Sequence, residues 1–91
     1  MKIEVFGKED CSLCKSAMRK VRHFLEKWGR ADEVEVAFVN MDTVDGMAEG
    51  MFRDVSDVPV VIVSDNGSTF GRWDGQPPKS EELKGALEKC S

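Results

Sequence analysis

The sequence has no long apolar segment. Of its 91 residues 41% are hydrophobic and 33% are charged, and no stretch approaches the roughly 18 apolar residues of a membrane-spanning helix. The apolar run at the N-terminus carries an early acid, Glu4, and is too short for the core of a secretory signal. We therefore expect a cytoplasmic protein that has no contact with a membrane.

Repeats, low-complexity segments and a dominant residue type are also missing. Disordered chains typically show low hydrophobicity, which this chain does not. Its length lies within the usual range for one compact domain with one core. We predict a single domain over residues 1–91.

Basic residues are fewer than acidic ones, 13 against 17, which leaves a net charge of -4. They are unevenly placed, because residues 11–30 hold six Lys or Arg against one Glu. Nucleic-acid-binding domains usually show a broad cationic face, so we expect no nucleic-acid partner. The basic segment is expected to be a solvated helix surface, with attraction of acidic partners by Lys15 and Arg19 as the alternative.

Cysteine is scarce, and its three residues cannot all pair within one chain. A reducing cytosol disfavours structural disulfides, so the close pair Cys11 and Cys14 indicates redox or metal chemistry. Structural zinc needs four ligands, and only Cys90 and His23 remain to complete a set. We therefore expect no metal site, and we expect Cys90 to be an exposed bystander.

Hydrophobic periodicity predicts seven elements in the order β-α-β-α-β-β-α. Strands are expected at 2–6, 34–39, 60–63 and 68–73, and helices at 11–28, 43–55 and 80–87. The apolar second strand is expected to be buried on both faces. Because strand-helix-strand crossovers are right-handed, we expect the first three strands to form a mainly parallel sheet with helices on both faces.

Several local features of the helices follow from residue type. Asp10 or Ser12 is expected to cap the first helix, and Ser80 the last, by accepting a bond from a free backbone amide. Gly29 is placed to end the first helix. Three methionines are expected to fill the core. They are Met18, Met47 and Met51.

The spacing of Cys11 and Cys14 places two thiols on one face of a helix start, within reach of each other. They follow the carboxyl end of a strand, where open α/β sheets place their chemistry. A helix N-terminus and nearby cations lower a thiol pKa from about 8.5, so we expect Cys11 to be the nucleophile, assisted by Lys8 and Lys15. Cys14 lies further into the helix and is expected to be buried and to resolve the mixed disulfide.

The motif Lys8-Glu9-Asp10-Cys11-Ser12-Leu13-Cys14, together with Asp57-Val58-Pro59 before a later strand, resembles a glutaredoxin within the thioredoxin-like superfamily. The resemblance covers nearly the whole chain. It implies a thioredoxin-like fold with a four-stranded mixed sheet and helices on both faces. It also implies a cis Val58-Pro59 bond facing the cysteines and a substrate contact at Asp57, Val58 and Pro59.

The sequence departs from both well-known branches of that superfamily. Ser12-Leu13 stands where glutaredoxins usually have Pro-Tyr and thioredoxins have Gly-Pro. The glutaredoxin Gly-Gly pair is missing, since Gly71 and Gly75 are separated by three residues.

These features predict a monomeric thiol-disulfide oxidoreductase that reduces protein or glutathione mixed disulfides. Disulfide-containing proteins are the expected substrates, and glutathione or a disulfide reductase is the expected electron donor. No bound cofactor is expected, with glutathione as a possible co-substrate. The alternative is a carrier of metal or of an iron-sulfur cluster that uses the same cysteines.

Overall fold

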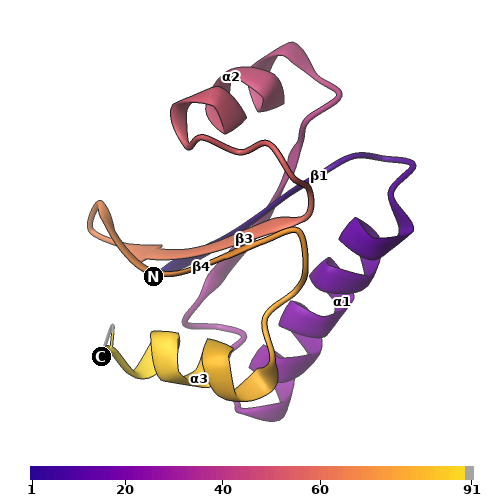
Figure 1. The fold of residues 1–91 in the computed structure, drawn as a ribbon. Helices are drawn as coiled ribbons and strands as arrows, with labels where there is room; N and C mark the ends of the chain where they lie inside the picture. Colours follow the sequence, from indigo (N-terminus) through magenta and orange to yellow (C-terminus); the bar gives the residue numbers. More distant parts are fainter. Residues whose placement is uncertain (90–91) are drawn as a thin grey trace.

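The computed structural model describes residues 1–89 of the chain, and the elements follow one another in the predicted order (Figure 1). They are β1 (Lys2–Gly7), α1 (Ser12–Lys27), β2 (Glu35–Asn40), α2 (Val44–Phe52), β3 (Val60–Asp65), β4 (Ser68–Asp74) and α3 (Ser80–Lys89). No helix within this part of the chain is both long and apolar enough to cross a membrane.

The four strands form one mixed sheet in the order β2-β1-β3-β4. β1 pairs with β2 in parallel, but β3 runs antiparallel to β1 and to β4. The prediction that the first three strands are mainly parallel is therefore wrong for β3. The nine residues of α2 span only about 13 Å. A six-residue strand is about 20 Å long, so α2 does not carry the chain back to the far edge before β3 begins.

β2 is an edge strand, and none of its six residues is fully buried. The prediction of burial on both faces is therefore wrong. The apolar side chains of β2 are only partly covered, and the exposed fraction of Phe38 reaches 36%. The central strand β3 has five buried residues in succession, as its apolar sequence predicts.

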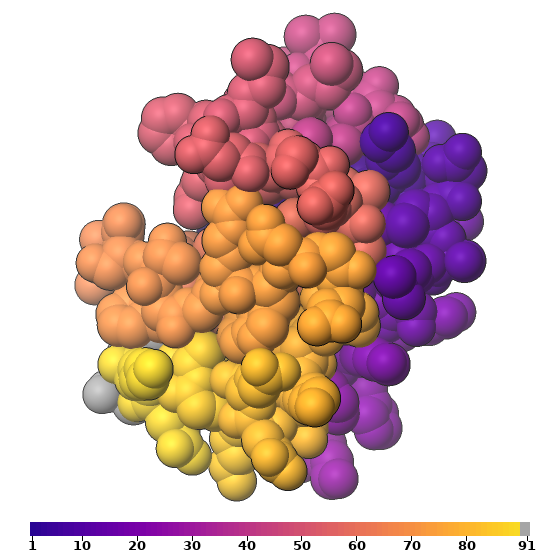
Figure 2. Space-filling view, viewed as in Figure 1, coloured from indigo at the N-terminus to yellow at the C-terminus, as the bar shows by residue number. Residues whose placement is uncertain are grey.

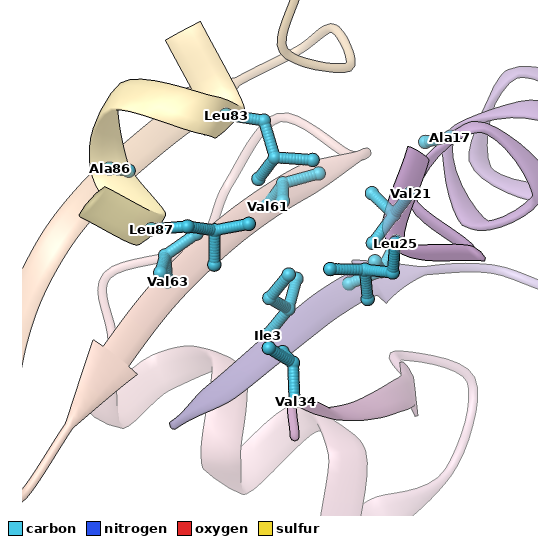
Figure 3. Close-up of a cluster of buried hydrophobic side chains, with 11 residues drawn as sticks. Ile3, Ala17, Val21, Leu25, Val34, Val61, Val63, Leu83, Ala86 and Leu87 are labelled. Carbon is cyan, nitrogen blue, oxygen red and sulfur yellow. The ribbon is translucent and has the colours of Figure 1, made fainter. Parts of the chain in front are cut away.

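The main core lies between the sheet and the helices α1 and α3, which cover the same face (Figure 3). β1 and β3 supply branched side chains from the sheet, and the two helices close over them with their apolar faces. The buried members are Ile3, Val5, Ala17, Val21, Leu25, Val34, Val61, Val63, Leu83, Ala86 and Leu87. Helix α1, which carries the cysteines, is thus anchored along its length.

Among the helices that the structure describes, α2 alone covers the other face of the sheet, where the buried cluster is small (Figure 1). The cluster consists of Phe6, Val60 and Ile62. The methionine prediction is wrong for Met47 and Met51, whose exposed fractions are 51% and 76%, whereas Met18 packs against the main core. The spacing of Met47 and Met51 is helical, but glycines occupy the face of α2 that meets the protein.

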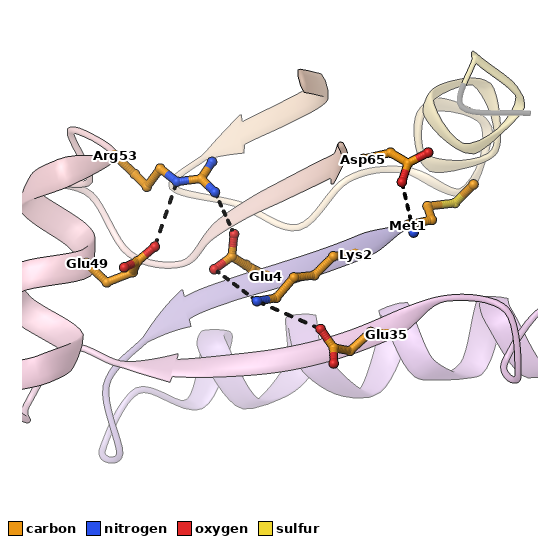
Figure 4. A network of polar contacts seen from close by, with 7 residues as sticks. All are labelled: Met1, Lys2, Glu4, Glu35, Glu49, Arg53 and Asp65. Carbon is orange, nitrogen blue, oxygen red and sulfur yellow. Dashed lines mark hydrogen bonds and ion pairs between the residues drawn. The ribbon is translucent and has the colours of Figure 1, made fainter. Parts of the chain in front are cut away.

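Polar contacts fasten the end of α2 to the sheet (Figure 4). The Arg53 guanidinium donates to the buried Glu4 carboxylate at 3.1 Å and also approaches Glu49. From β4, the Arg72 guanidinium donates to the backbone carbonyls of Arg53 and Asp54. In Figure 2, α2 and α3 lie at opposite ends of the molecule.

Two helix starts differ from the prediction. Cys11 itself, rather than Asp10 or Ser12, is the N-cap of α1. Ser80 is the first residue of α3, and the bond at that end runs from the Lys79 N–H to the Glu82 carboxylate at 3.0 Å. At α1 a cysteine takes the place of the usual capping residues, and at α3 the bond is the one that a glutamate at the third helical position commonly makes. The end of α1 is as predicted, with Gly29 at a φ of +68° just beyond it.

Candidate functional site

Cys11 and Cys14 form a disulfide at the start of α1, with their Cα atoms 5.2 Å apart. Cys11 is partly exposed, whereas Cys14 is completely buried. An incoming thiol or disulfide therefore has access to the Cys11 sulfur and not to the Cys14 sulfur. This asymmetry is the one expected from the positions of the two residues on the helix.

The Cys11 sulfur lies at the amino end of α1 and takes part in its hydrogen bonds. The Cys14 N–H donates to Cys11 Sγ at 3.1 Å, and the Lys15 N–H donates to the Cys11 carbonyl at 3.2 Å. The first amides of a helix are not satisfied within the helix and carry partial positive charge. After reduction, the same N–H would stabilise a thiolate on Cys11.

Gly7, the last residue of β1, allows the buried cysteine to pack against the strand. A Cβ at this position would lie 2.7 Å from the Cys14 Cβ, 2.9 Å from the Cys14 sulfur and 3.1 Å from the Phe38 ring. A side chain therefore cannot be added without displacing the disulfide or the ring. The sequence suggests only that Gly7 ends a strand, and its packing role depends on α1 folding back over β1.

A polar network that sequence reasoning missed holds the loop before Cys11. The Glu9 N–H donates to Asp42 Oδ2 at 3.2 Å, and Asn40 Nδ2 donates to Glu9 Oε1 at 2.9 Å. The Met41 N–H donates to the Gly7 carbonyl at 2.7 Å. A signal was present, since Asn40 ends and Asp42 closely follows a strand parallel to β1, and such strands end at the same edge of a sheet.

Pro59 also lies beside this site, just before β3, which runs antiparallel to β1. The Val58–Pro59 peptide bond is cis, and the proline side chain is fully buried. Val60 pairs with Phe6 in the sheet, so Pro59 comes level with Gly7, where β1 ends and Cys14 packs. The antiparallel direction of β3 is the reason, because a parallel third strand would begin at the far edge.

Asp57 and Val58, which precede this proline, differ in their backbone hydrogen bonds. The Asp57 carbonyl accepts from the Gly75 N–H at 3.2 Å, and the Pro59 carbonyl accepts from the same N–H at 2.8 Å. No backbone hydrogen bond of Val58 occurs within residues 1–89. Asp57 is exposed and Val58 partly exposed.

Lys8 and Lys15 are both brought to the disulfide. The Lys8 carbonyl accepts from the Cys11 N–H at 3.3 Å, and Lys15 follows Cys14 directly. Both side chains are exposed, and neither ammonium makes an ion pair in the described part of the chain. Their charge therefore faces solvent next to the cysteines.

An ion pair with shifted pKa values lies on β4. Arg72 donates to Asp74 Oδ1 at 2.9 Å and to Oδ2 at 3.1 Å. These hydrogen bonds lower the pKa of Asp74 and raise that of Arg72. Since Arg72 also holds the end of α2, this pair is structural and does not serve the disulfide.

Among residues 1–89, no group of three or more His, Cys, Asp or Glu side chains is arranged to hold a metal ion. His23 is exposed on α1 with its ring 6.0 Å from that of Phe24. Cys90, which sequence reasoning treats as a bystander, lies outside the described residues.

The architecture matches solved structures closely. Thioredoxin 1 of the thermophilic eubacterium Thermosipho africanus superposes with a TM-score of 0.75 over 99% of this chain and 93% of that one, at 21% identity. The chain has a thioredoxin-like fold. Thioredoxin-2 of the malaria parasite (TM-score 0.75, 19% identity, 99% and 82% covered) and thioredoxin O2 of Arabidopsis thaliana in its oxidized state (0.74, 18%, 97% and 72%) agree.

No protein-family model and no curated protein sequence matches the chain. The thioredoxin-like fold is therefore recognised from the arrangement of its elements rather than from sequence identity. Within this fold the paired cysteines follow β1 at the edge of the sheet, with Pro59 level with the end of that strand.

Proposed function

We propose that the chain is a thiol-disulfide oxidoreductase that works through Cys11 and Cys14. The observation that carries the proposal is the bonded pair itself, with one accessible sulfur at a helix N-cap and one buried sulfur. A structural disulfide does not require this asymmetry. Reversible exchange does, because one sulfur must be accessible to the target and the other must stay close enough to resolve the mixed disulfide.

In the reducing direction, the Cys11 thiolate attacks one sulfur of the target disulfide. The target S–S bond breaks, a mixed disulfide forms, and the other target sulfur leaves as a thiolate that takes a proton from water. Cys14 then loses its proton and attacks Cys11 Sγ, which releases the second target sulfur. Two electrons have moved to the target, and the Cys11–Cys14 bond stores the oxidised state.

The geometry of Val58 supports a substrate contact beside the disulfide. Its backbone N–H and carbonyl make no hydrogen bond among the described residues, next to a β-strand that begins at Val60. An extended target peptide would pair with this free backbone in the manner of an added strand. Pro59 and Asp57 would then line the contact, as the resemblance to glutaredoxins implies.

Regeneration requires a donor of two electrons, and we propose glutathione or a disulfide reductase. Protein disulfides are the proposed targets, with glutathione mixed disulfides as the second class. Lys8 and Lys15 would favour the anionic state of Cys11 in each turnover. The proposed setting is the cytoplasm, where a reducing pool keeps such a donor available.

Single cysteine replacements test the proposal. Reduction of a protein disulfide is followed with dithiothreitol as donor, and reduction of a small glutathione mixed disulfide with glutathione and its reductase. We expect Cys11→Ser to abolish both reactions, and Cys14→Ser to accumulate a mixed disulfide that mass spectrometry detects. Cys90→Ser, which also removes one thiol, is the matched control and should keep the wild-type rate.

Activity of Cys11→Ser at the wild-type rate would refute the assignment. The same preparations report on the iron-sulfur alternative, which stays a prediction. A visible absorption band that depends on Cys11, in protein inactive in both assays, would favour a cluster carrier instead.

A further inference from the structure

A groove between α1 and β2 lies on the other side of the disulfide from Pro59. Its volume is about 400 Å³, within the usual range for ligand pockets. We propose that this groove docks an acidic segment of the target protein that carries one apolar side chain. The proposal rests on the proposed function and names the substrate class of that same site.

The floor of the groove is apolar. Met18 from α1 and Phe38 from β2 line it, and Phe38 has an exposed fraction of 36%. An aromatic ring left this open on an edge strand offers contact area to an incoming side chain. The floor therefore favours a ligand with an apolar group, and a bare inorganic anion would leave it uncovered.

The rim of the groove is cationic. Lys8, Lys15, Arg19 and Arg22 line it, together with one acid, Glu9. All four cations are exposed, and none is ion-paired among the residues that the structure describes. The Glu9 carboxylate, which accepts from Asn40, offsets only one of the four cations, so the rim keeps an excess of positive charge.

The groove reaches the reactive cysteines. Lys8 and Lys15 are both hydrogen-bonded through their backbones to Cys11. The Phe38 ring and the Cys14 sulfur lie against the same point of Gly7. A peptide whose acidic segment adjoins its own disulfide would therefore occupy the groove while its sulfur meets Cys11.

Charge elsewhere on the chain argues for a short acidic segment rather than a long polyanion. Outside residues 11–30 the sequence has seven basic and sixteen acidic residues. A nucleic acid would extend beyond the groove and meet this negative charge. A peptide with a few acids around one leucine places its charges on the rim and its leucine on the floor.

Binding is measured first, with a fluorescently labelled peptide that has four acids around one leucine and no cysteine. We expect Arg19→Glu/Arg22→Glu to weaken binding by at least about 10-fold, because two rim contacts become repulsive. Lys20→Glu/Lys27→Glu changes the same net charge on the same helix, and neither residue lines the groove. This matched control should stay within about 2-fold of wild type at 0.15 M salt, where charges beyond about 8 Å are screened.

Two more peptides test the chemistry of the ligand. Replacing the acids by lysines should abolish binding, and replacing the leucine by serine should weaken it. Equal weakening by both double variants would overturn the proposal, since it would mean long-range attraction without docking. Indifference to the leucine would overturn it as well, as would equally tight binding of a single-stranded oligonucleotide.

The kinetic arm separates this inference from the proposed function. Reduced protein is reacted with two mixed disulfides, one of an acidic peptide and one of a neutral peptide. The ratio of the two second-order rate constants is then measured. We expect a ratio above one that falls towards one in Arg19→Glu/Arg22→Glu and is kept in Lys20→Glu/Lys27→Glu. Reaction with neither peptide would refute the oxidoreductase, whereas a ratio near one in the wild type would refute only the groove.

Discussion

The two faces of the sheet are stabilised in different ways. On one face, α1 and α3 pack on the sheet in a cluster of eleven buried apolar residues, some of which come from the two helices (Figure 3). On the other, α2 covers a cluster of three and is held by the contact of Arg53 with Glu4 (Figure 4) and by hydrogen bonds from Arg72 to backbone carbonyls. The outward surface of α2 is instead apolar and open, with exposed fractions of 83% at Val44 and 82% at Phe52.

The two faces therefore differ in how firmly they hold the residues of the disulfide site. The reactive cysteines stand on α1, whose buried residues run from Cys14 to Leu25, so their geometry rests on the best-packed part of the molecule. Pro59 follows α2 in the chain, and α2 covers the smaller of the two buried clusters. A disulfide on a firmly packed helix keeps the position of Cys11 constant while its partners change.

The largest expected effect contrasts one buried and one exposed side chain. Leu25→Ala should lower the free energy of unfolding by about 2–5 kcal/mol, because it opens a cavity in the main core. Met51→Ala, on the open surface of α2, should change it by less than about 0.5 kcal/mol. Chemical denaturation of the oxidised proteins measures both, and similar losses would abolish the contrast between the faces.

Two helix glycines offer a second contrast of opposite sign. A Cβ at Gly46 in α2 would collide with the Asn40 carbonyl, so Gly46→Ala should destabilise the fold by about 1–3 kcal/mol. A Cβ at Gly85 in α3 meets open space, so Gly85→Ala should stabilise it by about 0.5–1 kcal/mol. Thermal unfolding compares the two, and stabilisation by Gly46→Ala would show that α2 does not rest against the β2 end.

The smallest effect concerns the arginine contacts and depends on pH. Because Arg72 lowers the pKa of Asp74 below its ordinary value of 3.8, the pair adds stability above that pH. This stability is lost as the pH falls through the lowered pKa of the folded state. Both side chains are partly exposed, so the difference between wild type and Asp74→Asn should be at most about 1 kcal/mol near pH 7. Denaturation at neutral and at strongly acidic pH measures it, and a difference that does not shrink in acid would rule out the ion pair as its source.

Much of the fold follows from local pattern. The alternation in Ile3 and Val5 and the turn at Asn66-Gly67 each predict their element because a few neighbouring residues decide it. The turn residues have the positive φ values that such a hairpin requires. The direction of β3 does not follow in this way, since Val60 to Val63 read alike in a parallel or an antiparallel strand.

Local spacing likewise does not say which helical face is covered. Met18 and Met47 both lie at apolar positions, yet only Met18 meets the core. The loop network of Glu9, Asn40 and Asp42 joins residues more than thirty positions apart, so no window of sequence contains it. Its existence depends on β1 and β2 ending side by side.

The sequence by itself determined the order of the elements, the cysteine pair at a helix start and the cations beside it, because these depend on spacing and side-chain type. Only the tertiary structure decided that Cys11 caps its own helix, that Pro59 comes level with Gly7, and that Phe38 and Met18 open a groove between the cations. These features need segments from different strands to meet at one edge. Chain direction and packing bring these segments together, and neither can be predicted from a single stretch of residues.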